Sequence, residues 1–87
     1  MRLYGRPIYD NFALTEVMAS NDDKNLSFHQ QLEKCFLEVC RNLDISVPIW
    51  LDKNTTEFAC FRRTFFMKDQ FIDEVKFDKL EIQIEID

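Results

Sequence analysis

The sequence predicts a small α+β domain in which two helices pack on one face of an antiparallel sheet of three or four strands. Three observations support this prediction. The last eight residues, 80–87, alternate apolar and polar side chains without a break, which indicates a half-buried strand. Two runs near the N-terminus have the pattern of a strand pair, and two middle stretches begin with helix start signals. We expect residues 1–87 to form a single domain.

The first two expected strands, residues 2–9 and 12–19, flank the dipeptide Asp10-Asn11. Short polar side chains tolerate the positive φ angles of a two-residue hairpin turn, so we expect an N-terminal hairpin. Pro7 cannot donate a hydrogen bond to a neighbouring strand, so we expect it near the strand end or on an unpaired edge. The expected cross-strand neighbours are Tyr9 with Phe12, Pro7 with Leu14, and Leu3 with Met18.

A helix is expected to begin directly after Ser27, because Ser27 and Gln30 have the spacing of a capping box. The extended residue that precedes Pro48 places the end of this helix near Leu43 or Asp44. One apolar stripe at three- and four-residue steps should face the sheet, and it contains Phe28, Leu32, Cys35, Phe36, Val39 and Leu43.

A second, shorter helix is expected from about Thr55 to Arg63, with Asn54 as its N-cap and Glu57 in its first turn. Its buried face should include Phe58, Phe61 and Phe65. Residues 64–71 fit either an extended return or a packed loop, and the sequence does not decide between them.

The terminal strand should turn Leu80, Ile82, Ile84 and Ile86 toward the core. Val75 and Phe77 alternate out of phase with this strand, which indicates a bulge or turn at Asp78-Lys79. If the first strand pairs with the last, Arg2 and Arg6 lie across from Glu81 and Glu85 and form cross-strand ion pairs.

Composition narrows the class of protein. Eleven basic and sixteen acidic residues give a net charge of −5, which disfavours general binding to nucleic acid. No apolar run approaches the roughly 20 residues of a membrane span. Three cysteines without a CxxC spacing, and an N-terminus without an apolar signal core, favour a reducing cytoplasm.

Neither a metal site nor a catalytic residue is predicted. Cys35 and Cys40 lie about 140° apart around a helix, and Cys60 has no local partner, so we expect three reduced, metal-free thiols. His29 falls on the polar face of the first helix, four residues before Glu33, where a solvated surface histidine is expected. No cofactor is expected, and a chain with one Gly lacks most phosphate-binding loops.

The strongest candidate for a binding site is the stretch from Trp50 to Lys68, in which basic residues stand among aromatic ones. Exposed Arg and aromatic side chains are typical of protein interface centres and of platforms for single-stranded nucleic acid. The alternative is that these rings belong to the core and that the two Arg residues complement a helix dipole. The candidate binding residues are Trp50, Arg62, Arg63, Phe66 and Lys68.

The second half of the chain resembles a group of small bacterial proteins for which no activity is established. The resemblance rests on Pro48-Ile49-Trp50-Leu51, Asn54-Thr55-Thr56-Glu57-Phe58, Arg63-Thr64, Phe66, Phe71, Phe77 and the acidic-apolar terminal strand. It implies a bacterial cytosolic setting and a compact domain, and it transfers no functional residue.

The function that these observations favour is a non-catalytic cytosolic interaction domain that binds a protein partner or associates with itself as a homodimer. The alternative is a regulatory nucleic-acid-binding protein that uses Arg62, Arg63 and Lys68. An enzyme has only His29 and scattered carboxylates to support it.

Overall fold

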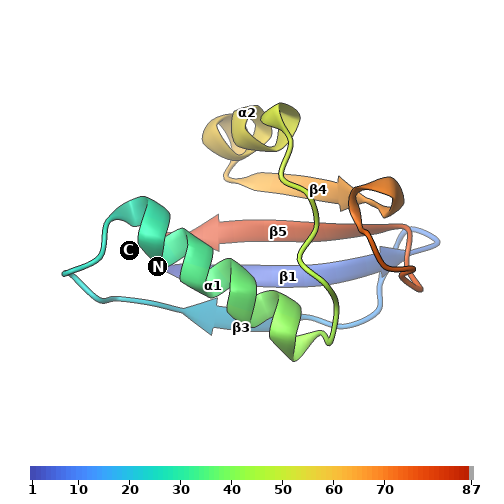
Figure 1. Cartoon of the computed structure of the whole chain (residues 1–87), viewed down its shortest axis with the longest axis horizontal. Helices are drawn as coiled ribbons and strands as arrows, with labels where there is room; N and C mark the ends of the chain where they lie inside the picture. The colour runs from blue at the N-terminus through green and yellow to red at the C-terminus, as the bar shows by residue number, and fades with distance from the viewer. Residues whose placement is uncertain (87) are drawn as a thin grey trace.

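The computed structural model describes residues 1–86 and has the predicted α+β arrangement, with both helices on one face of an antiparallel sheet (Figure 1). The sheet order is β2-β1-β5-β4, and β3 also pairs with β1. The elements are β1 (Arg2–Tyr9), β2 (Phe12–Ala13), β3 (Val17–Ser20), α1 (Phe28–Asn42), α2 (Asp52–Phe61), β4 (Arg63–Met67), the 3-10 turn η1 (Lys68–Gln70) and β5 (Lys79–Glu85). Five strands form the sheet where three or four were expected, because one hairpin arm divides and β4 joins β5.

The N-terminal hairpin forms at the predicted turn. Asp10 and Asn11 have φ angles of 52° and 68°, and Tyr9 pairs with Phe12. The second arm, however, is not one strand, because it breaks between β2 and β3 opposite Pro7, which has no N–H to donate. The break shifts the register by one residue. The predicted pair of Leu3 with Met18 is therefore wrong, and the observed pairs of β1 with β3 are Arg2–Ser20, Leu3–Ala19, Tyr4–Met18 and Gly5–Val17.

Helix α1 begins and ends where the sequence predicted. The Ser27 hydroxyl accepts from the Gln30 N–H at 3.2 Å, and the Gln30 side chain accepts from the Ser27 N–H at 2.9 Å. The helix packs closely on β1 at Gly5, where an added Cβ would lie 2.4 Å from Val39 Cγ1. Phe28 is a correction to the predicted stripe, because it lies at the helix start beyond the sheet and is 51% exposed.

Helix α2 begins three residues earlier than predicted, and Asn54 is not its N-cap. Asn54 instead lies inside the first turn and is fully buried. The helix ends at Phe61 because Arg62 adopts a left-handed conformation, with φ 57° and ψ 23°. The chain then turns back into β4. Phe61 was expected in the core and is 71% exposed, since the helix ends before this side chain can reach the sheet.

The two remaining segments complete the sheet. Residues 63–67 form the extended return, as β4, and Phe66 is fully buried. Val75 and Phe77 are buried in an irregular segment, and β5 begins after it at Lys79. The alternation in β5 is confirmed for Leu80, Ile82 and Ile84, which are all buried. Ile86 is a correction, because it lies past the end of β5 and is 48% exposed.

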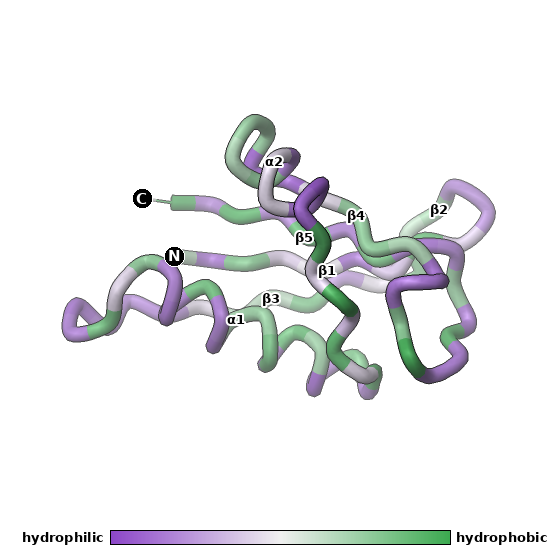
Figure 2. Tube along the Cα trace, turned by 45° about the horizontal axis from the view of Figure 1, so that its top comes forward, coloured by the Kyte–Doolittle hydropathy of each residue, from purple (hydrophilic) through white to green (hydrophobic). Residues whose placement is uncertain are grey.

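The pairing of the first strand with the last is also confirmed. Arg2 lies opposite Glu85 and Arg6 opposite Glu81, and both pairs form ion pairs on the face of the sheet that carries no helix. On the other face, the connection between α1 and α2 crosses the sheet, and Figure 2 shows mostly hydrophobic residues along it. This connection brings Trp50 to the core between the two helices.

Candidate functional site

A groove of about 800 Å³ lies between the N-terminal half of α1 and the helix α2, above the C-terminal end of β5. Its walls come from four separate segments of the chain. Its lining consists of Phe28, His29, Leu32, Glu33, Phe36, Val47, Pro48, Trp50, Thr55, Phe58, Ala59, Arg62, Ile84 and Ile86. Most of these side chains are apolar, and the charged ones come from the two helices. The groove is therefore an apolar channel with charged walls.

The inner end of the groove is formed by packed aromatic rings. The Trp50 ring meets Phe36 and Phe58 edge-on, with centroids 5.8 Å apart in both pairs, and lies 5.3 Å from the Phe66 ring. Trp50 Nε1 donates to the Thr55 hydroxyl at 2.8 Å, which satisfies the indole N–H. These contacts fix the ring, so this end of the groove is preformed.

The wall formed by α2 is held on β4 by a buried hydrogen-bond network. Asn54 Nδ2 donates to the Thr64 hydroxyl at 2.8 Å and to the Phe65 carbonyl at 2.9 Å. Its Oδ1 accepts from the Leu51 N–H and from Gln70 Nε2, both at 2.9 Å. Buried polar groups with every hydrogen bond made favour one arrangement of the chain. This network therefore fixes the α2 wall of the groove against β4.

The outer end of the groove exposes apolar surface. Phe28 and Ile86 are about half exposed, and Val47 in the connection is exposed as well. Contiguous exposed apolar surface beside a polar rim is typical of binding sites for proteins or ligands.

The two walls carry opposite charges. On α1, His29 is 86% exposed, as expected for a surface histidine, and its Nε2 lies 3.9 Å from the Glu33 carboxylate. On α2, the exposed Arg62 has no ion-pair partner among residues 1–86. A negative side chain therefore lies on one wall and a positive side chain on the other.

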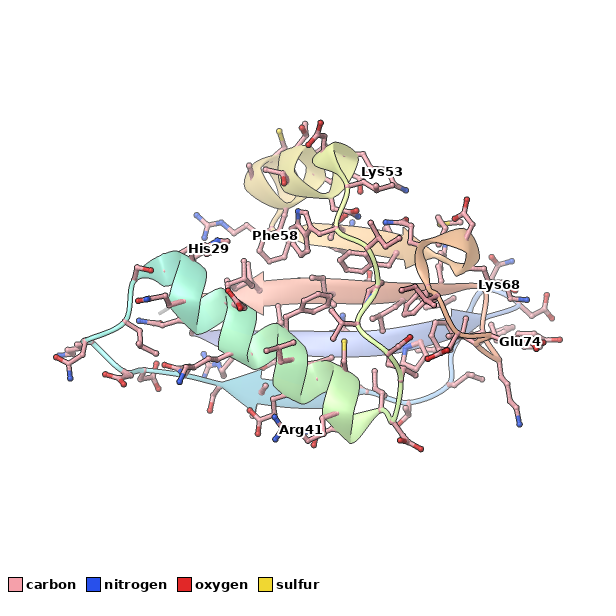
Figure 3. All side chains as sticks on the ribbon, in the orientation of Figure 1. His29, Arg41, Lys53, Phe58, Lys68 and Glu74 are labelled. Carbon is pink, nitrogen blue, oxygen red and sulfur yellow. The ribbon has the colours of Figure 1, made fainter. Side chains whose placement is uncertain are left out.

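The structure separates the five residues that the sequence predicted as one binding surface. Trp50 and Arg62 both line the groove. Phe66 is fully buried behind Trp50 and belongs to the core. Arg63 lies on the open face of the sheet, 3.8 Å from Glu81. Lys68 begins η1 and lies on the right in Figure 3, away from His29 and Phe58.

Sequence reasoning missed the α1 wall of the groove. Phe28 and Leu32 were assigned to the sheet-facing stripe, and Glu33 to the solvated face. The apolar stripe of α1 begins at Phe28, the first residue of the helix, whereas the buried residues of the helix begin only at Cys35. This excess of apolar side chains at the N-terminal end is the one sequence signal of a groove wall. The same stripe would form part of a core if α1 and α2 were in contact here, and the sequence does not give the distance between the two helices.

The open face of the sheet gathers charged side chains of both signs around aromatic rings. Arg6 contacts both Glu16, at 2.5 Å, and Glu81, at 3.0 Å. The Phe65 ring lies 4.8 Å from Lys79 Nζ and 5.9 Å from the Arg63 guanidinium. The Arg6 guanidinium is therefore shared between two carboxylates on this face.

The thiols lie in different environments. Burial raises the pKa of the Cys40 thiol to about 11 and also raises the pKa of Cys35, so both are poor nucleophiles at neutral pH. Cys60 is exposed on α2. Within residues 1–86, no three His, Cys, Asp or Glu side chains gather closely enough to hold a metal ion.

A scan against protein-family models and searches of curated proteins and of solved structures each find no match. Neither helix within the described residues has the length and apolar content that crossing a bilayer requires.

Proposed function

We propose that this chain is a non-catalytic protein-interaction domain whose groove between α1 and α2 binds apolar side chains of a protein segment. The observation that supports the proposal most strongly is the groove itself, an apolar channel of about 800 Å³ with a preformed aromatic end. The three thiols fit action in a reducing cytoplasm, where such side chains stay reduced.

A protein segment fits the groove better than a small molecule does. Small-molecule sites bury about 70–90% of the ligand inside a concave pocket. Here Phe28 and Ile86 stand half exposed at the outer end, so a ligand confined to the channel leaves these side chains in water. A partner with two or three apolar side chains on a broader surface covers both the channel and its rim.

Nucleic-acid binding has one specific observation in its favour, the cations around the Phe65 ring on the open face of the sheet. Bases stack on exposed rings of this kind. Arg63 lies near Glu81, however, and the chain carries a net charge of −5. Binding of apolar side chains in the groove does not depend on the sign of the net charge, so the protein-binding function is the better supported of the two.

The proposal is tested by selecting peptides from a random library against the wild-type domain and measuring their affinity for two variants. Ala59→Trp fills the groove from α2, and Thr56→Trp adds the same ring to an exposed position of α2 outside the groove. We expect the selected peptides to bind Ala59→Trp at least about tenfold more weakly, a loss of about 1.4 kcal/mol, and Thr56→Trp as the wild type. Equal binding to all three proteins places the peptide site elsewhere and contradicts the proposal.

A single-stranded DNA oligonucleotide tests the alternative. Binding through phosphate contacts falls steeply as the salt concentration rises, whereas an apolar protein interface is much less sensitive. Salt-sensitive binding that Arg63→Glu abolishes and Ala59→Trp leaves intact would support the nucleic-acid function instead.

A further inference from the structure

We infer that the partner that fills the groove is a second copy of this chain, so that two domains associate face to face through their grooves. This inference rests on the proposed function and names the partner of the same site. It follows from two properties of the groove face, its shape and the placement of its charges.

The groove face carries both a hollow and the side chains that fit a hollow. Phe28 and Ile86 line the groove and are about half exposed at its outer end. In a two-fold dimer the same patch of both copies meets, so a patch must be complementary to itself. Projecting apolar side chains next to an apolar channel meet this condition.

The charges select one orientation of the two-fold axis. Glu33 lies on the α1 wall and Arg62 on the α2 wall. An axis along the groove turns the α1 wall of one copy toward the α2 wall of the other, so that Glu33 faces Arg62 of the partner subunit twice in the dimer. An axis across the groove places like charges together. The self-complementary arrangement also gives Arg62 the ion-pair partner that it lacks among residues 1–86.

The size of the face sets the expected strength. A standard interface buries about 800 Å² on each partner, roughly one seventh of the 5802 Å² accessible surface of this chain. An interface of this size needs the groove together with both of its rims. We expect a dimer that dissociates in the micromolar range, which is the weak end of the affinities that interfaces of this size reach.

Charge reversal tests the inference by sedimentation velocity over about 5–500 µM protein, a range chosen to cover weak association. We expect Glu33→Arg and Arg62→Glu each to raise the dissociation constant at least about tenfold. The double variant, which exchanges the two charges, should restore it to within about threefold of the wild type. Lys68→Glu reverses a charge outside the groove and should leave association unchanged. Circular dichroism checks the fold of each variant, and Arg62→Gln replaces Arg62→Glu if that variant does not fold.

The remaining outcomes separate the two proposals. A wild-type chain that is monomeric throughout this range overturns the self-association, and so does a double variant that fails to recover. If the selected peptides still lose affinity for Ala59→Trp, the groove remains a site for another protein. If instead the dimer forms equally well in Ala59→Trp, the groove is not the dimer interface and the self-association through it fails. The peptide measurement then decides the proposed function on its own.

Discussion

Arg62 has a backbone conformation that glycine adopts more easily than any other residue. A left-handed residue after the last helical turn is most often Gly, and a residue with a Cβ pays roughly 1–2 kcal/mol there. The Arg62 N–H still donates to the Phe58 carbonyl at 2.9 Å, so the helix end has its normal hydrogen bond. An arginine at a position that favours glycine, with its side chain on the groove wall, indicates that the guanidinium has a use beyond the fold.

Replacing Arg62 with glycine should therefore separate stability from association. We expect Arg62→Gly to raise the free energy of unfolding by roughly 0.5–1 kcal/mol, because the strain disappears and the higher entropy of unfolded glycine offsets only part of the gain. Self-association should weaken as in Arg62→Glu. Urea denaturation and sedimentation measure the two effects.

Asp44 provides the matched control, since it is also left-handed, with φ 56°, and lies outside the groove. Asp44→Gly should stabilise the chain less, because a short polar side chain tolerates this conformation better than an arginine does, and it should leave association unchanged. If Arg62→Gly instead lowers stability by more than about 0.5 kcal/mol, the arginine side chain supports the fold through packing, and the strain argument fails.

At the scale of elements, the two helices differ in how well the sequence predicts them. The limits of α1 follow from contacts within a few residues, the Ser27–Gln30 capping box and the turn after Leu43. The start of α2 depends on Asn54, whose side chain accepts from the nearby Leu51 N–H but also bonds to three residues that lie 10 to 16 positions away. A pattern of neighbouring residues contains no information about β4 and η1. Such a pattern therefore assigns this asparagine to an N-cap.

Loss of the Asn54 side chain should destabilise the whole domain. Asn54→Ala leaves several buried donors and acceptors without partners, each of which costs about 1–3 kcal/mol. We expect the free energy of unfolding to fall by about 3 kcal/mol or more in urea denaturation. Thr56→Ala, at an exposed position of the same helix, should change it by less than about 0.5 kcal/mol. A loss below about 1 kcal/mol for Asn54→Ala would mean that water replaces the network.

At the scale of the molecule, alternation and cross-strand charge predicted the central pair of strands correctly, down to the opposition of Arg2 with Glu85 and Arg6 with Glu81. The stretch in which basic residues stand among aromatic ones gave two of the groove residues, Trp50 and Arg62. It could not find the groove, because the space between α1 and α2 depends on the strand order and on the path of the connection between the helices. These are long-range properties that no local period encodes.

The central position of β5 gives the last prediction, which compares two isoleucines of one alternating pattern. Ile82 is fully buried between β1 and β4, whereas Ile86 lies beyond the strand at the outer end of the groove. We expect Ile82→Asp to prevent folding, because an unpaired buried charge costs several kcal/mol against a total stability of about 5–15 kcal/mol. Ile86→Asp should fold, since half of that side chain is already in water.

Circular dichroism melts and the dispersion of amide proton resonances distinguish the two variants. The groove adds a second readout for Ile86→Asp, which should fold cooperatively and yet associate at least about tenfold more weakly than the wild type, because its charge enters an apolar interface. A cooperative melt of Ile82→Asp within a few degrees of the wild type would contradict the central place of β5. Wild-type association of Ile86→Asp would show that this end of the groove stays in solvent in the dimer. A carboxylate buried in the interface without a partner would weaken association.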